Sequence, residues 1–258
     1  MNNAYLLKSG RIIFAIGMMG LGIYCLVFQN FIVARPPGWK VPVSMLVAYT
    51  SGSLLVIASV LILFNKKAGI AALVMGAVIL IFSVFKNFPN FGPDAVGAYK
   101  ALAYFGAALI VFAASLPDDA GFKNRLLSDR NFSRWIFISG CVLLAAFFII
   151  GGRAHFKWAD GVQYLIPEYI PWRLFWTYFA GVCLFAGGIG LLLPPTRKLA
   201  AILSGVMIMG WVLLLHLPRL IYNPTDPDIR LEIFEATAFS GIFFFVAGMV
   251  TKRGALNT

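Results

Sequence analysis

Eight long apolar runs constrain this chain more than any other feature of its sequence. Each is about twenty residues long, the length that a helix needs to cross the ~30 Å hydrocarbon core of a bilayer. The runs do not alternate apolar and polar residues, as lipid-facing barrel strands do. The sequence therefore predicts an all-α integral membrane protein with eight helices. The predicted spans are Ile12–Val33, Ser44–Phe64, Ala68–Phe85, Gly97–Ser115, Trp135–Gly152, Trp172–Leu193, Leu199–Leu217 and Leu231–Val250.

The charge content agrees with a membrane location. Charged residues make up only 12% of the 258 residues, about half the share of an ordinary soluble domain. The net charge of +11 comes from basic residues in the connections between apolar runs, where it acts as a topology signal, and this argues against nucleic acid as a partner. A slight excess of basic residues on one side predicts cytoplasmic N- and C-termini. The lipid bilayer is the expected partner.

The two halves of the chain align with each other. At an offset of 129 residues, Tyr49 falls on Tyr178 and Pro89 on Pro218, and at a slightly larger offset Lys100 falls on Glu235. Each unit has an even number of spans, so the fold class is an eight-helix bundle made of two tandem parallel four-helix repeats, related by an axis along the membrane normal. We predict a first repeat at 1–116, a cytoplasmic linker at 117–134 and a second repeat at 135–258.

Polar residues distinguish the second repeat from the first. Asn87 in the first repeat is replaced by His216 in the second, and the connection after the fifth span is longer and contains His155. These residues share one predicted membrane face, so we expect an outward-facing pocket among the last four spans, roofed by the segment His155–Ile170. The predicted catalytic residues are His155, Glu168, His216 and Glu235, and the predicted ligand-binding residues are Arg173, Arg219, Glu232, Trp172, Trp176 and Tyr178.

Several of these residues also have structural interpretations. His155 fits a solvated loop, and Glu168 fits a helix N-terminus. The aromatic residues fit an interfacial belt. Glu235 lies inside an apolar span, where a carboxylate is costly and is usually paired or functional; it fits either an ion pair with Lys100 or a proton-handling or ligand-binding group. No helix has two metal ligands at coordinating spacing, so we predict no metal site.

The second repeat resembles the DoxX-like family of small bacterial membrane proteins. The resemblance is carried by His155-Phe156, the lead Leu165–Pro171 into the sixth span, the glycine-rich run from Phe179 to Leu191, the turn Arg197–Ala201, and His216. The first repeat has only the skeleton of this pattern and lacks the histidine. The resemblance implies a multi-pass protein of the bacterial inner (cytoplasmic) membrane. Some members are subunits of quinone-linked oxidoreductases, and others accompany redox or stress-response enzymes.

The leading functional hypothesis is a redox-associated membrane protein that binds a quinone or a similar amphiphile. In it, the two histidines donate hydrogen bonds or protons, the acids orient them, the arginines hold an anionic group and the aromatic rings stack on the ligand. The sequence has no haem or iron–sulfur motif, so electrons would come from a partner redox enzyme or a soluble substrate. The alternatives are a non-enzymatic scaffold, chaperone or lipid-binding subunit of a larger complex, and a small-molecule transporter. Whether any reaction is catalysed stays open.

Overall fold

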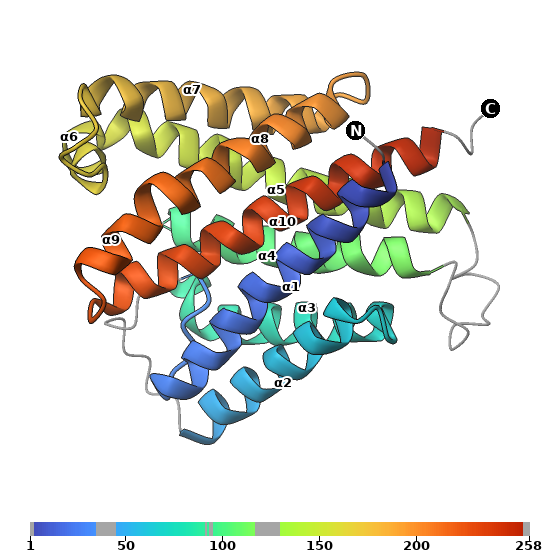
Figure 1. Ribbon diagram of the computed structural model, residues 1–258. Coiled ribbons are helices and arrows are strands. Elements are labelled where there is room, and N and C mark those ends of the chain that lie inside the picture. Colours follow the sequence, from blue (N-terminus) through green and yellow to red (C-terminus); the bar gives the residue numbers. More distant parts are fainter. Residues whose placement is uncertain (1–2, 35–44, 91, 93–94, 117–129, 255–258) are drawn as a thin grey trace.

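The computed structural model describes residues 3–34, 45–90, 92, 95–116 and 130–254 (Figure 1). Within these residues every regular element is a helix and none is a strand. Eight helices are long and apolar enough to cross a membrane, which confirms the predicted helical class and the presence of eight helices of spanning length. They are α1 (Asn3–Val27), α2 (Met45–Leu63), α3 (Ala68–Lys86), α4 (Ala95–Ser115), α5 (Arg130–Lys157), α7 (Arg173–Leu192), α8 (Arg197–Trp211) with its continuation, and α10 (Pro227–Gly254).

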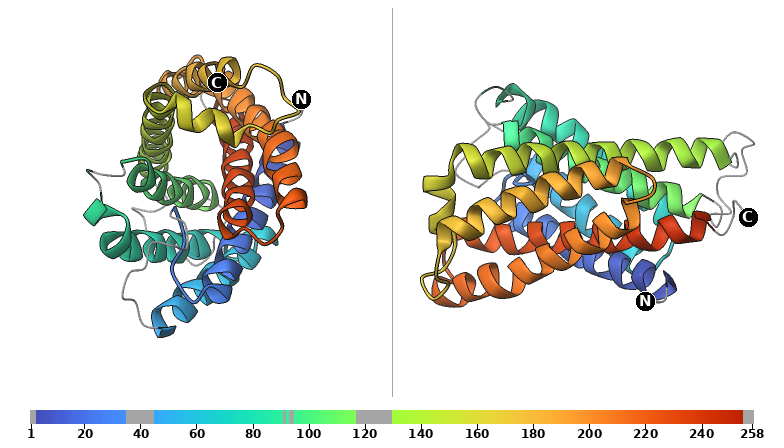
Figure 2. Two further views of the ribbon diagram at one scale, coloured as in Figure 1. Left: turned by 90° about the vertical axis from the view of Figure 1, so that its left-hand side faces the viewer. Right: turned by 90° about the horizontal axis from the view of Figure 1, so that it is seen from above.

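Five short elements complete the described structure. The 3-10 helix η1 (Phe88–Asn90) follows α3, and a short helix α6 (Ala159–Val162) and a 3-10 turn η2 (Gln163–Leu165) join α5 to α7. The helix α8 continues through a π-helical turn, η3 (Val212–His216), into α9 (Leu217–Tyr222). We call residues 158–170, which contain α6 and η2, the cap. The cap lies at the end of the bundle opposite the N- and C-termini (Figures 1 and 2).

The long helices form a closed ring. Each packs against the next one along the chain, in the order α1, α2, α3, α4, α5, α7, α8 and α10, and α10 returns to pack against α1. Helices α4 and α10 also touch each other across the middle of this ring. The left view of Figure 2, along the helices, shows α4, α5, α7, α8 and α10 surrounding one half of the ring. The cavity described below lies among these five helices.

Glycine allows the closest helix pairs to approach backbone to backbone. A Cβ atom at Gly241 of α10 would lie 2.1 Å from the backbone nitrogen of Phe14 in α1, and one at Gly17 would lie 2.4 Å from that of Ala238. At the contact of α4 with α5, a Cβ atom at Gly140 would lie 2.5 Å from the carbonyl oxygen of Gly106. Small residues at such contacts let two helix backbones approach closely. In lipid, the resulting van der Waals packing drives helix association, because the hydrophobic effect does not act between helices there.

The predicted first span, Ile12–Val33, is wrong at both ends. The helix α1 begins at Asn3 and ends at Val27, and the chain then turns inward through Gln29 and Ala34, which have positive φ angles of 50° and 67°. Residues 31–34 are therefore buried without being helical. Hydropathy alone does not distinguish a buried apolar loop from the end of an apolar helix, so the sequence interpretation merged the two.

We call residues 31–34 the plug, because they are buried among the first four helices. The plug lies at the same end of the bundle as the cap, which belongs to the second half. Two buried side chains of the α3 terminus hold it. The ammonium of Lys86 donates a hydrogen bond to the carbonyl oxygen of Phe31. The amide of Asn87 donates to the carbonyl oxygen of Val33 (3.4 Å) and to the hydroxyl of Ser83 (2.9 Å). The plug is thus held, fully buried, inside this half of the molecule.

Candidate functional site

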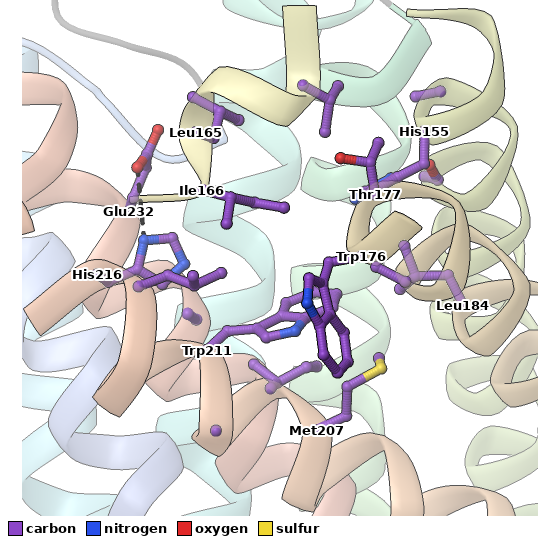
Figure 3. A pocket seen from close by; sticks show the side chains of 18 of the residues that line it. His155, Leu165, Ile166, Trp176, Thr177, Leu184, Met207, Trp211, His216 and Glu232 are labelled. Atoms are coloured by element: carbon purple, nitrogen blue, oxygen red, sulfur yellow. Dashed lines mark hydrogen bonds and ion pairs between the residues drawn. The ribbon is translucent and has the colours of Figure 1, made fainter. Parts of the chain in front are cut away.

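A cavity of about 850 Å³ lies in the second half of the molecule, beneath the cap. Its walls come from α4, α5, α7, α8, η3, α9 and α10, and the cap closes one end with side chains such as Ile166 and Leu165 (Figure 3). Most of the lining is aliphatic or aromatic, and polar side chains are few. This volume falls in the range of small-molecule sites, which are mostly apolar with a small number of placed polar groups.

Two ion pairs lie along one side of the cavity. In the first, Nη1 of Arg219 in α9 is 2.5 Å from Oε2 of Glu232 in α10. Nδ1 of His216 lies 3.5 Å from the same oxygen (Figure 3), without the geometry of a hydrogen bond. In the second, Nζ of Lys100 in α4 is 2.6 Å from Oε2 of Glu235. Glu232 and Glu235 are three residues apart in one helix, so both carboxylates face the same side.

Glu235 therefore forms the ion pair with Lys100 that is one of its two predicted roles. The pair leaves its second oxygen, Oε1, buried and without a hydrogen-bond partner among the described residues. A buried polar atom without a partner costs free energy, and this one belongs to a residue that lines the cavity. The carboxylate is thus both a structural link and an acceptor for a ligand or a water molecule.

His155 lies on the other side of the cavity, at the end of α5 (Figure 3). Its Nδ1 is 2.8 Å from the carbonyl oxygen of Gly151, one helical turn earlier. A carbonyl oxygen can only accept, so Nδ1 carries the hydrogen, and Nε2 of the neutral ring has a lone pair for a ligand. The ring lies beside Trp211, with the two ring centroids 6.4 Å apart.

The π turn at the cavity wall has a cause in the sequence. Pro218 has no N–H, and its ring clashes with the carbonyl group four residues earlier, that of Leu214. The helix responds by widening over Val212–His216, and such π turns are frequent at functional sites. The phenol of Tyr169 in the cap donates a hydrogen bond to the freed oxygen of Leu214. The cap is therefore fastened to the wall beside His216.

The structure gathers some of the predicted site residues and separates others. Those that line the cavity are His155, Trp176, His216, Arg219, Glu232 and Glu235. Four predicted residues do not line it: Glu168, Trp172, Arg173 and Tyr178. Glu168 is 96% exposed and lies 3.5 Å from Arg173, while the ring of Tyr178 stacks on Phe156 with centroids 5.5 Å apart.

Other lining residues were absent from the predicted site. Lys100 and Val96 come from α4, so the cavity includes residues of the first half of the chain. The sequence contained a signal for Lys100, because it aligns with Glu235. Trp211 and Thr177 also line the cavity, and nothing in a single apolar sequence sets them apart from neighbouring residues that face lipid. No group of three metal-ligand side chains gathers within the described part of the chain.

Comparisons with known proteins give one match. Residues 144–217 match a family described as Domain of unknown function (DUF8561). This segment covers less than half of the chain, yet it contains both histidines, the cap and the cavity walls from α5, α7, α8 and η3. No curated protein and no solved structure matches. The resemblance to the DoxX-like family stays a prediction.

Proposed function

We propose that this chain is a multi-pass membrane protein that binds an amphiphile, with a quinone as the leading candidate, in the cavity of its second half. The observation that carries the proposal is the cavity itself, because about 850 Å³ of largely apolar space with a few polar groups is what such a ligand requires. The predicted inner-membrane location, with both termini cytoplasmic, would put the cap on the outer side. The resemblance to DoxX-like proteins supports the choice of a quinone.

The order of helices supports two four-helix repeats. Exchanging α1 with α5, α2 with α7, α3 with α8 and α4 with α10 leaves the set of packed neighbours unchanged. A pseudo-two-fold axis along the membrane normal would produce this pattern. When the helices of the two halves are exchanged in this way, the place of the plug in the first half corresponds to the place of the cavity in the second. We infer that the first repeat has closed its interior with its own loop and that the second repeat has kept a binding site there.

A redox role would use the two histidines. His155 and His216 face the cavity from opposite sides (Figure 3), and imidazole is the side chain best suited to exchange protons near neutral pH. Glu232, which lies beside His216, would orient that ring. Electrons would come from a partner redox enzyme. Binding without chemistry, as a lipid-binding subunit or scaffold, is the second candidate, and the mutual pairing of the charged groups favours it.

A binding experiment tests the proposal. The full chain in phosphatidylcholine nanodiscs would be titrated with decyl-ubiquinone, with quenching of tryptophan fluorescence as the readout, because Trp176 and Trp211 line the cavity. Ala180→Phe should reduce binding, since Ala180 lines the cavity. Val182→Phe is the matched control, because Val182 lies on the same helix and is exposed away from the cavity.

Saturable binding that Ala180→Phe weakens and Val182→Phe leaves intact would support the cavity as the site. Equal effects of the two variants, or no saturable binding, would refute it. The redox candidate needs a further result, namely quinone reduction in the presence of the electron donor that His216→Ala abolishes while binding persists. If binding occurs and no reduction accompanies it with any donor tested, the non-enzymatic candidate stands.

A further inference from the structure

We propose that the ligand is an uncharged amphiphile with a single tail, whose head lies between His155 and His216 and whose tail leaves between α7 and α8 into the bilayer. This inference rests on the proposed function and specifies the ligand class and its route of entry. It is carried by three observations: the balance of charge in the cavity, the polar atoms that remain for a ligand, and an opening in the wall. An isoprenoid quinone and a long-chain alcohol share this chemistry.

The charges that line the cavity cancel. Among the described residues, the lining contains two cations and two carboxylates, and each cation lies within 2.6 Å of one carboxylate. A charged ligand head would have to break one of these pairs or enter an apolar space without a counter-ion, and both are costly. An uncharged head has neither penalty. The site thus disfavours fatty acids, amines and phospholipids, because their headgroups are charged.

Hydrogen-bonding atoms remain for an uncharged head. The hydrogen bond of His155 to Gly151 occupies Nδ1, so its Nε2 can accept from a hydroxyl group. On the other side, Oε1 of Glu235 is buried and has no hydrogen-bond partner among the described residues, and Nδ1 of His216 has only the long contact of 3.5 Å to Oε2 of Glu232. A hydroxyl head can donate to Nε2 of His155 or to Oε1 of Glu235, whereas a carbonyl head only accepts and can pair only with an N–H of His216; either head would satisfy an atom that is otherwise costly to bury.

The wall of the cavity opens between α7 and α8. These helices touch closely at the end where their loop joins them. A Cβ atom at Gly190 would lie 2.6 Å from the Cβ atom of Ala200, and a Cβ atom at Gly187 would lie 2.5 Å from the hydroxyl oxygen of Ser204. Toward the cap the two helices diverge (Figure 1). A Cβ atom at Gly210, which lines the cavity, would meet nothing within 4 Å.

Side chains at this gap belong to the cavity and to the outer surface at once. Trp176 and Phe179 of α7 line the cavity and are 40% and 49% exposed, and Leu214 on the facing turn is 59% exposed. All three are apolar or aromatic, and they lie on spans predicted to cross the membrane. A gap between two adjacent helices, walled in this way, suits one hydrocarbon chain, and it connects the cavity with lipid instead of water.

The first test compares ligand heads on one tail. Competition against decyl-ubiquinone in neutral phosphatidylcholine nanodiscs would use hexadecanol, palmitate and hexadecylamine. We expect hexadecanol to compete, and we expect palmitate and hexadecylamine to bind with an affinity lower by about tenfold or more. A tenfold change in affinity corresponds to ~1.4 kcal/mol, and breaking a buried ion pair costs more than that. Palmitate or hexadecylamine binding as well as the alcohol would overturn this inference and leave the proposed function standing. If even decyl-ubiquinone does not bind, the proposed function fails, and this inference with it.

A change of selectivity tests the role of the ion pairs apart from their structural role. Glu232→Gln would leave the charge of Arg219 unbalanced, so palmitate should gain affinity relative to hexadecanol. Lys100→Met would leave Glu235 unbalanced, so hexadecylamine should gain instead. A merely structural effect would lower binding of all three probes together, and that result would contradict the inference.

The tail route is tested with Gly210→Phe, which should obstruct the gap and whose Cβ atom would meet nothing within 4 Å. We expect weaker or slower binding of decyl-ubiquinone and unchanged binding of duroquinone, which has no tail. Gly161→Phe is the matched control, because a Cβ atom at Gly161 also meets nothing within 4 Å and this residue does not line the cavity. Equal losses for both quinones, or an equal effect of the control, would refute the route.

Discussion

The ion pair between Lys100 and Glu235 gives a quantitative prediction, because it joins α4 of the first half to α10 of the second at the centre of the bundle. Breaking a buried ion pair costs about 3–5 kcal/mol. Polar contacts between membrane helices average about 0.6 kcal/mol and reach about 1.7 kcal/mol. The side chains of Lys100 and Glu235 are 24% and 8% exposed, so this pair lies between the two cases. We expect Lys100→Met and Glu235→Gln each to lower the free energy of unfolding by about 2 kcal/mol.

The double variant separates the pair from its surroundings. Removing both charges also removes the penalty of an unpaired charge, so its loss should be smaller than the sum of the two single losses by about 1 kcal/mol. Unfolding can be followed by titration with a denaturing detergent and labelling of thiols, because Cys25 and Cys141 are buried and are not joined in a disulfide. Lys66→Met is the control, since Lys66 is exposed. Strictly additive losses, or single variants as stable as the control, would refute the reasoning.

Two further variants test the packing around the site. Tyr169→Phe removes the hydrogen bond to the oxygen of Leu214, and it should raise amide hydrogen exchange in the cap with a cost of about 1 kcal/mol; unchanged exchange there would contradict the fastening of the cap. Gly241→Ala would place its Cβ atom 2.1 Å from the backbone of Phe14, and it should lower the free energy of unfolding, followed by thiol labelling, by about 1–3 kcal/mol or more. Gly161→Ala meets open space and should be tolerated, so equal losses would contradict close packing of α1 on α10.

The spans were predictable because crossing a bilayer needs a minimum length of apolar sequence, and that length can be read directly. The ends of the spans were less predictable. Residues 31–34 are as apolar as the helix before them, and only the packing of the whole first half shows that they leave the helix and fill its interior. The buried Lys86 that holds them looks, in sequence, like a basic residue at the end of a span.

The candidate site was predictable to the extent that its chemistry is rare in apolar sequence. His216, Glu232 and Glu235 stand out because polar groups inside spans are costly, and they line the cavity. The position of a residue close to the start of a helix was a poorer indication that it belongs to the site. Trp172 adopts a left-handed backbone conformation, with φ of 57°, just before α7, and both it and Glu168 lie on the outside. Which way a side chain points at such a turn depends on one dihedral angle, which the sequence leaves open.

The size of the cavity constrains what fills it. Creating an empty apolar cavity inside a protein costs about 24 cal/mol per Å³. That coefficient applies to a closed cavity, whereas the space of about 850 Å³ in the second half opens between α7 and α8 and can admit lipid tails. The first half avoids this cost by filling its interior with residues 31–34. Among the described residues of the second half, no such segment fills the corresponding space, which is large enough to hold a lipid tail or a ligand. In the proposed binding mode, lipid tails enter through the opening between α7 and α8, and a specific ligand binds by displacing them. Its affinity comes from the head, where two histidines and an unpaired carboxylate oxygen offer hydrogen bonds that a lipid tail cannot make.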